Sequence, residues 1–273
     1  MSSTTALPFD RAAVKERQRA VWASGDFAAV ATTIVPVAER LCDAADLHAG
    51  SSVIDVACGS GNAAIAAARL GCVVTGIDYV PALLERGRER AAAERIDVDF
   101  RDGDAEQIPF PDESFTAALS VFGSMFAPDQ RRAAAELVRV TQPGGTIALA
   151  SWTPDGFIGE MFKTVAAHVP PSPTLASPML WGSEEHLSEL FGSDVSWVHR
   201  RRTFTFRFVS AAAFVQFFAA HYGPTVKALE AAGSRRPQLA QDLHDLALTW
   251  NRIEQPGPIA VPADYLESVG SRR

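Results

Sequence analysis

The strongest constraint on the fold is a segment in which an apolar run, a glycine-rich turn and an alanine-rich stretch follow one another directly. It reads VIDVACGSGNAAIAAARLG and covers residues 53–71. The short apolar run VIDVA is typical of a strand buried on both faces, and Gly71 stands where a helix commonly ends. A strand, a tight turn and a helix in this order form the unit from which parallel sheets are built.

The same unit recurs through the first half of the chain. CVVTGID at residues 72–78 predicts a second strand, and Pro81 stands where the first turn of the following helix accepts proline. Three more strands are predicted at residues 96–104, 115–123 and 146–152, with an amphipathic helix between the last two. Strands that alternate with helices favour an α/β fold with a doubly wound, Rossmann-like and mostly parallel sheet.

The pattern of elements divides the chain into three predicted parts. Residues 1–50 form an N-terminal helical segment, since apolar side chains recur there at helical spacing. Residues 51–155 hold the alternating Rossmann-like core, and residues 156–273 complete the sheet with an antiparallel edge strand. Within this last part we expect a helical lid over about residues 211–254, broken near Gly223.

Charge, cysteine content and hydropathy exclude several classes of function. The formal net charge of -7 disfavours a nucleic-acid partner, and the basic run HRRR at residues 199–202 is typical of the solvated rim of a strand. No apolar run approaches the roughly 20 residues of a membrane span. The three cysteines lack metal-type pairing and fit a reducing compartment. We therefore expect a cytoplasmic protein with no metal site and no membrane span.

Acidic residues and glycines stand at the ends of the predicted strands. In an open parallel sheet the ligand crevice lies outside these ends. Asp55, Asp78 and Asp104 each stand at or just before the end of one of the first three strands. Gly59 and Gly61 let a ligand approach the backbone, where the following helix offers free N–H groups. Carboxylates can accept hydrogen bonds from the hydroxyls of a ribose and from the amine of an adenine. The three acids and the glycine turn together predict a ligand made of adenosine with an amino-acid-like tail.

Two cofactors fit that description, a dinucleotide and S-adenosylmethionine. GSGNAA at residues 59–64 satisfies the dinucleotide fingerprint in its weaker form. Asp55 favours S-adenosylmethionine, because an acid just before the turn repels a pyrophosphate but can hold the ammonium of a methionine.

Several motifs in register resemble the class I methyltransferases over about residues 53–152. They are the segment VIDVACGSGNAAIAAARLGCVVTGIDYVPALLERGRERA, then DGDAEQIPFPDESFTAALSVFGSMFAPD, then QPGGTIALASW. The resemblance is closest to the small-molecule branch that includes quinone-biosynthesis methyltransferases. The chain departs from that family's pattern at Ala57, where a glycine is usual, at Thr116, where an aspartate is usual, and at Gln142, where a lysine is usual.

The resemblance implies a role for each strand end in holding S-adenosylmethionine. The first turn would border the methionine part, Asp78 would bind the ribose, and Asp104 with Ala105 would flank the adenine. The residues that we expect to contact the cofactor are Trp22, Asp55, Ala57, Cys58, Gly59, Gly61, Asp78, Tyr79, Asp104, Ala105, Ser120 and Phe122.

Catalytic residues remain unassigned by the sequence. Methyl transfer from a sulfonium is a direct displacement, for which alignment of the two reactants supplies much of the acceleration. If a general base is used, His221 and Tyr222 are the candidates, since they lie in the segment expected to cover the pocket.

The predicted function is transfer of a methyl group from S-adenosylmethionine to a small, apolar or aromatic acceptor. The aromatic side chains of the expected lid, Phe214, Phe217, Phe218 and Tyr222, could line a closed pocket for it. The alternatives are a non-catalytic protein that binds the cofactor and regulates a partner, and an NAD(P)-dependent oxidoreductase. The sequence leaves open whether oxygen, nitrogen or carbon is methylated, and whether the chain forms a homodimer.

Overall fold

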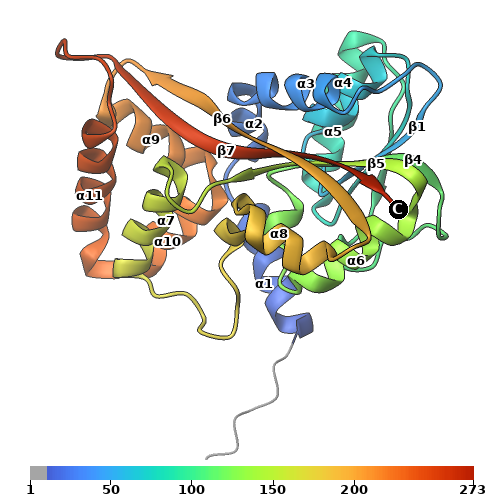
Figure 1. Cartoon of the computed structure of the whole chain (residues 1–273). Coiled ribbons are helices and arrows are strands. Elements are labelled where there is room, and N and C mark those ends of the chain that lie inside the picture. Colours follow the sequence, from blue (N-terminus) through green and yellow to red (C-terminus); the bar gives the residue numbers. More distant parts are fainter. Residues whose placement is uncertain (1–10) are drawn as a thin grey trace, which may run out of the picture.

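One sheet of seven strands organises the computed structural model, which describes residues 11–273 (Figure 1). Residues 1–10 of the predicted N-terminal segment lie outside the described part. The strand order is β3-β2-β1-β4-β5-β7-β6. The strands are β1 (Ser52–Val56), β2 (Val73–Asp78), β3 (Asp99–Asp102), β4 (Phe115–Val121), β5 (Thr141–Trp152), β6 (Val195–Phe208) and β7 (Ile259–Arg272).

Helices flank the sheet, and Figure 1 shows α3 and α4 above it and α6 and α8 below it. Short 3₁₀ segments lie between some of the helices and strands of the described residues: η1 (Ser124–Phe126), η2 (Pro178–Gly182) and η3 (Gly233–Arg235). The helices are α1 (Arg11–Trp22), α2 (Phe27–Thr33), α3 (Val35–Ala44), α4 (Asn62–Arg69), α5 (Pro81–Glu94), α6 (Gln130–Val140), α7 (Phe157–His168), α8 (Glu184–Phe191), α9 (Ala211–His221), α10 (Gly223–Ala231) and α11 (Arg236–Thr249).

The parallel half of the sheet contains the predicted switch in strand order. β1 pairs in parallel with β2 on one side and β4 on the other, so that Ile54 lies between Thr75 and Ala118. Val53 and Ile54 are fully buried, which explains the continuous apolar run. Because the strand order reverses at β1, a crevice opens beyond the carboxyl ends of β1 and β4.

The antiparallel part of the sheet lies at its β6 side. β7 runs antiparallel to both β5 and β6, from the pair Val195 and Arg272 to the pair Phe208 and Ile259. The antiparallel strand is thus β7, and β6 forms the edge of the sheet outside it. The α/β fold with a mostly parallel, Rossmann-like sheet is confirmed.

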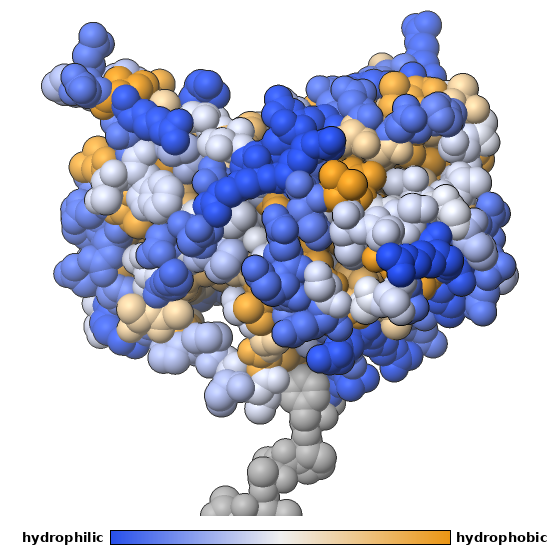
Figure 2. All heavy atoms as spheres, in the orientation of Figure 1, coloured by the Kyte–Doolittle hydropathy of each residue, from blue (hydrophilic) through white to orange (hydrophobic). Residues whose placement is uncertain are grey.

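The basic run at residues 199–202 lies on β6 and is neutralised by acids of neighbouring segments. Arg201 pairs with Asp155 at 2.9 Å and Asp264 at 3.0 Å, and Arg202 pairs with Glu267 at 3.1 Å. Figure 2 shows a hydrophilic band across this face, with hydrophobic residues only in scattered patches. These ion pairs favour the prediction that the run is the solvated rim of a strand.

None of the helices within residues 11–273 is long and apolar enough to cross a membrane.

The helices of the expected lid, α9 to α11, form a group with α7 beside the outer ends of β6 and β7 (Figure 1). α9 ends at His221, and α10 begins at Gly223 with Pro224 in its first turn. A Cβ on Gly223 would lie 2.0 Å from the carbonyl oxygen of Val21, so α10 approaches the end of α1 more closely than any larger residue allows. The lid is therefore packed directly on the N-terminal helix. The division of the chain at residues 50 and 155 stays a prediction.

Candidate active site

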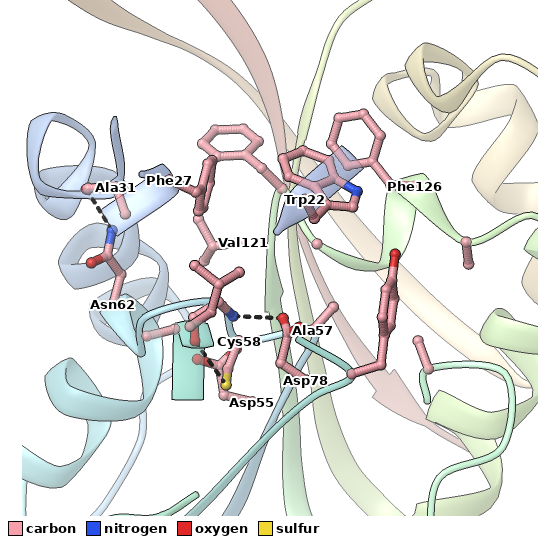
Figure 3. Close-up of a pocket in the computed structure, with 18 of the residues that line it drawn as sticks. Trp22, Phe27, Ala31, Asp55, Ala57, Cys58, Asn62, Asp78, Val121 and Phe126 are labelled. Atoms are coloured by element: carbon pink, nitrogen blue, oxygen red, sulfur yellow. Dashed lines mark hydrogen bonds between the residues drawn. The ribbon is translucent and has the colours of Figure 1, made fainter. Parts of the chain in front are cut away.

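A cavity of about 870 Å³, its open mouth included, lies at the carboxyl ends of β1, β2 and β4 (Figure 3). The rest of its wall comes from α1 and α2, the first turns of α4 and α5, the segment that follows β3, and residues 126–128. Ten of the twelve residues expected to contact a cofactor line it: Trp22, Asp55, Ala57, Cys58, Gly59, Asp78, Tyr79, Asp104, Ala105 and Phe122. We call it the first cavity.

Asp55 forms the floor of the first cavity and also caps a helix. Its Oδ2 accepts a hydrogen bond of 2.8 Å from the backbone N–H of Ala64, in the first turn of α4. No ion pair to Asp55 is present in the described part of the chain. Burial raises the pKa of its carboxyl to about 7.

Asp78 ties the end of β2 to the glycine turn that follows β1. Its carboxylate accepts hydrogen bonds of 2.9 Å each from the backbone N–H groups of Gly59 and Val80. Burial raises its pKa to about 6, against the lowering effect of these bonds. Two buried carboxylates, neither with a cation beside it among residues 11–273, thus face one cavity.

Unusual backbone conformations concentrate around the first cavity. Ala57, which stands where the family that the chain resembles usually has glycine, has a φ of 53°, in the left-handed region that favours glycine. Phe122 has a φ of 54°, which is rare for a bulky residue. Its ring stacks on Trp152 with a centroid separation of 3.8 Å. The next residue, Gly123, lies so close to the Ala57 backbone that an added Cβ would be 2.4 Å from the Ala57 carbonyl oxygen.

Two of the expected contact residues, Gly61 and Ser120, do not line the first cavity. A Cβ on Gly61 would lie 2.6 Å from the ring of Phe100, so this glycine gives that ring its space. The hydroxyl of Ser120 donates to the Val56 carbonyl at 2.8 Å and accepts from the Ser124 N–H at 2.8 Å. Both residues support the cavity wall through contacts with neighbouring residues and do not face the cavity themselves.

The end of the first cavity near Asp104 is closed by Lys15, a residue that sequence reasoning missed. Its ammonium lies 2.5 Å from Asp104 and 2.7 Å from Glu106, whose side chain is 1% exposed. Glu106 also accepts a hydrogen bond of 2.7 Å from the backbone N–H of Asp129. These contacts fasten α1 over the cavity.

A second cavity of about 400 Å³ adjoins the first and shares Trp22, Phe27, Ile34, Phe122 and Phe126 with it. Its wall is almost wholly aromatic or aliphatic, and comes from the N-terminal helices, η1, the ends of β4, β5 and β6, and α7 and α9. The lining residues are Trp22, Phe27, Val30, Ile34, Phe122, Phe126, Trp152, Ile158, Met161, Phe206, Phe218 and Tyr222.

Trp22 lines both cavities, and Figure 3 shows its ring next to Phe126 in the wall of the first. Its ring makes edge contacts with Phe27 at 5.4 Å, Phe126 at 4.9 Å and Tyr222 at 5.8 Å between centroids. A tryptophan held by aromatic edges on three sides is fixed in orientation. It therefore forms a rigid part of the wall common to both cavities.

The two candidate bases lie in different places. Tyr222 lines the second cavity, and burial raises the pKa of its hydroxyl above the ordinary value. His221 lines neither cavity: its ring packs on Phe217 at 4.9 Å, and its carbonyl accepts from the Asp26 N–H at 3.1 Å. Of the lid phenylalanines, Phe218 reaches the second cavity, whereas Phe214 and Phe217 pack within the lid and against β6.

Comparison with known proteins identifies the family. A family model described as a methyltransferase domain matches residues 54–149. The uncharacterized protein Rv1405c of Mycobacterium tuberculosis is 40% identical over 239 residues, which cover 85% of this chain and 87% of that protein. The demethylmenaquinone methyltransferase of Deinococcus radiodurans is 35% identical over 128 residues, covering 45% of this chain and 53% of that enzyme. The chain thus contains a methyltransferase domain, and its resemblance to the class I methyltransferases is confirmed.

This methyltransferase also shares its fold with solved structures of low sequence identity. The YcgJ protein from Bacillus subtilis superposes with a TM-score of 0.61 at 18% identity, over 86% of this chain and 97% of that chain. A geranyl diphosphate methyltransferase in complex with S-adenosylmethionine gives 0.52 at 19%, over 88% and 85%. At such identities the likeness shows the fold alone, so the methyl acceptor has to be argued from the methyltransferase's own cavities.

Proposed function

We propose that the protein binds S-adenosylmethionine in the first cavity and transfers its methyl group to a small apolar or aromatic acceptor in the second. One observation carries this proposal: an acidic cavity at the strand ends and an apolar cavity share a wall of five residues. Two reactants bound in cavities that adjoin along these five residues would lie next to each other, which is the main requirement of a direct displacement.

The polar groups of the first cavity fit this cofactor. Buried carboxylates with raised pKa values are stabilised by a ligand that brings a positive charge or hydroxyl donors. Asp55 would hold the ammonium of the methionine part, and Asp78 the ribose hydroxyls. Asp104 and Ala105 would border the adenine, and the backbone at Gly59 leaves room for the ligand to approach.

One of these carboxylates, Asp55, argues against a dinucleotide. A pyrophosphate beside the glycine turn would face Asp55, with only backbone N–H groups to offset the repulsion. Asp78 would suit the ribose of either cofactor, so it is the charge of Asp55 that disfavours the oxidoreductase alternative.

In this proposal the residues of the protein act by positioning and by excluding water. When bound, the sulfonium cofactor supplies an activated methyl group. Trp22, Phe27 and Phe122 present apolar surface where the two cavities meet, so they would keep water away from the reacting atoms. The contacts of Lys15 with Asp104 and Glu106 would keep α1, which carries Trp22, in its closed position. No general base is needed in this scheme, since alignment supplies the acceleration.

Calorimetry with S-adenosylhomocysteine and NADH tests the cofactor assignment. We expect micromolar binding of S-adenosylhomocysteine and none of NADH; the reverse result would overturn the proposal. Transfer of labelled methyl from S-adenosylmethionine to a panel of phenols, enols, thiols and aromatic amines then tests the activity. Tight cofactor binding without transfer to any member of a broad panel would favour the non-catalytic alternative, in which the protein binds the cofactor and regulates a partner.

A further inference from the structure

Arg90, on α5, places a half-buried positive charge beside the glycine turn that follows β1. Its Nη1 donates to the Ser60 carbonyl at 2.7 Å and to the Asn62 Oδ1 at 2.8 Å, with the Ser60 hydroxyl at 3.2 Å. No ion pair to Arg90 is present within residues 11–273. Glu94, one helical turn further along α5, is instead held by Arg69 through two hydrogen bonds of 2.7 Å. The Arg90 guanidinium therefore bonds to the turn through neutral oxygens alone.

A charged group is a costly way to fasten a turn. Ser60 is 1% exposed and Asn62 is 9% exposed, so Arg90 reaches below the surface to meet them. Burial lowers the pKa of the Arg90 guanidinium from its ordinary value, because its charge is partly removed from water. An uncharged donor could make the same bonds at a smaller desolvation cost. What an arginine adds is a permanent positive charge and a group that can only donate.

The donor-only character of Arg90 fixes the orientation of the Asn62 amide. Asn62, the first residue of α4, lines the first cavity. Its Oδ1 accepts from Arg90, and its Nδ2 donates to the Ala31 carbonyl of α2 at 2.8 Å (Figure 3). Turning the amide over would set donor against donor and acceptor against acceptor. One N–H of Nδ2 has no partner in the described part of the chain, so Asn62 can meet a ligand only as a donor.

We infer that Arg90 is a positioning residue for the amino-acid end of the cofactor, and that Asn62, held by it, donates a hydrogen bond to the cofactor's carboxylate. This inference rests on the proposed function.

The two charged groups of a methionine tail then have complementary partners on the two sides of the glycine turn. Asp55, at the end of β1, would hold the ammonium, and Asn62, at the start of α4, the carboxylate. A ligand carboxylate that enters the first cavity also meets the repulsion of Asp55 and Asp78. The charge of Arg90, transmitted through the Asn62 amide, offsets part of that repulsion.

Two ligands that differ only at the amino-acid end test the inference. S-adenosylhomocysteine and 5′-methylthioadenosine share the adenosine and the sulfur, but the second lacks the amino-acid group. We expect Asn62→Ala and Arg90→Met each to lower the affinity for S-adenosylhomocysteine about tenfold by calorimetry, because a hydrogen bond to a charged group is lost or misplaced. The affinity for 5′-methylthioadenosine should stay within about twofold. Damage to the fold of the cavity would lower both affinities together.

Two further arginine variants separate positioning from stability. All three contacts of Arg90 come from one nitrogen, and a lysine ammonium has three donors. Arg90→Lys should therefore bind S-adenosylhomocysteine within about threefold of wild type. Arg88→Met is the matched control, since Arg88 lies on the same helix and donates to the carbonyl of Phe100 at 2.8 Å, a residue that lines neither cavity. It should leave both affinities unchanged.

A double variant decides whether Arg90 acts through Asn62. If it does, Arg90→Met combined with Asn62→Ala should bind S-adenosylhomocysteine about tenfold to twentyfold more weakly than wild type, and not the about hundredfold that independent losses give.

Four results would each overturn the inference: additive losses, equal losses for the two ligands, no rescue by Arg90→Lys, or an unchanged S-adenosylhomocysteine affinity in Asn62→Ala. The Asn62→Ala and Arg90→Lys variants keep the test decisive even if Arg90→Met does not fold. Failure of S-adenosylhomocysteine to bind to wild type would instead refute the proposed function.

Discussion

The two cavities of this methyltransferase differ in charge and in how the chain builds them. The first is mainly formed by turns that directly follow neighbouring strands, and it contains two buried carboxylates with raised pKa values. The second is apolar and draws on segments as distant as α1 and α9. Since the sheet brings successive strand ends together, the first cavity follows from the fold itself, whereas the second depends on how the helices are packed around the sheet.

This difference indicates a division of labour. A cavity made from strand ends is expected to keep the same ligand as long as the fold is kept. A cavity made from packed helices can change its shape by side-chain substitution without disturbing the sheet. Variants of the first cavity should therefore alter cofactor binding, and variants of the second should alter acceptor binding alone.

The largest effects are expected when either glycine of the first turn is replaced by valine. The two variants should lose different properties, cofactor binding in one and stability in the other. Gly59→Val should weaken S-adenosylhomocysteine binding more than about a hundredfold, because a β-branched side chain resists the φ of 56° and enters the cavity. Gly61→Val should mainly destabilise the fold by several kcal/mol, through its clash with Phe100. Calorimetry and thermal unfolding measure the two losses.

Gly144→Val serves as the control for backbone strain. Gly144 has a φ of 77°, but no described heavy atom lies within 4 Å of an added Cβ. This variant should lose stability and keep cofactor affinity. If Gly59→Val is folded and binds normally, that part of the first turn does not touch the cofactor.

Removal of the Asp78 carboxylate should weaken the cofactor site but leave the second cavity intact. We expect Asp78→Ala to lower S-adenosylhomocysteine affinity by about 1.5 to 3 kcal/mol, the range for hydrogen bonds to a charged group. Asp102→Ala, at an exposed position at the end of β3, is the control and should change affinity little. Unchanged affinity in a folded Asp78→Ala protein would contradict the ribose assignment.

Acid should stabilise the ligand-free protein and weaken its cofactor binding. Asp55 has a pKa of about 7 when folded and about 3.9 when unfolded, so between these values the folded state binds more protons. The free energy of unfolding should therefore fall as pH rises from 5 to 8, by on the order of 1–3 kcal/mol. Affinity for S-adenosylhomocysteine should change in the opposite sense, rising about tenfold, because its ammonium favours the ionised carboxylate.

Denaturant titrations and calorimetry at the two pH values measure these opposite trends. Asp55→Asn should weaken both dependences, leaving the share that comes from Asp78, whose pKa is also raised. Parallel trends in stability and affinity would show that the Asp55 carboxylate does not meet the positive group of the ligand.

The second cavity should respond to the loss of an aromatic ring without any effect on the first. Phe218→Leu should lower the affinity for naphthalene and 1-naphthol alike, by about 1 kcal/mol, because apolar contact area is lost. S-adenosylhomocysteine binding should stay within about twofold. Phe217→Leu, which alters a ring that lines neither cavity, is the matched control. Equal losses in both variants would mean that the lid acts only through its packing.

The smallest expected effect is a gain in stability at Ala57. With its φ of 53°, this residue carries strain that a glycine would relieve by about 1–2 kcal/mol. The greater entropy of glycine in the unfolded chain offsets about half of this. We expect Ala57→Gly to be neutral or up to about 1 kcal/mol more stable by denaturant titration, with only a small loss of cofactor affinity because a single methyl group leaves the cavity wall. A loss of stability would show that the Ala57 methyl packs favourably against Gly123.

The strand-end part of the first cavity could be predicted from the sequence, because its residues stand in short motifs. Gly61 and Ser120 do not line the first cavity, although they stand in the same motifs as residues that do. Successive residues near a strand end point in different directions, and the order of residues in a motif does not show which of them point into the cavity. Lys15 could not be predicted, because its partner Asp104 is 89 residues away and a lysine in a charged helix carries no local signal.

Most of the second cavity could not be predicted, for a different reason. Phe218 and Tyr222 were expected from the aromatic lid, but Met161, Trp152 and Phe206 were not. Apolar residues at helical or strand spacing have the same pattern whether they fill a core or line a cavity. Only the three-dimensional packing distinguishes the two.

The position of β7 has a consequence for the order in which the molecule forms. β7 (Ile259–Arg272) is the last strand in sequence, yet it lies between β5 and β6. On the ribosome, β1 to β5 can pair as soon as they emerge, but β6 has no neighbour in the sheet until β7 arrives. Phe206 of β6 helps to line the second cavity. The nascent chain can therefore assemble the first cavity well before it can assemble the second.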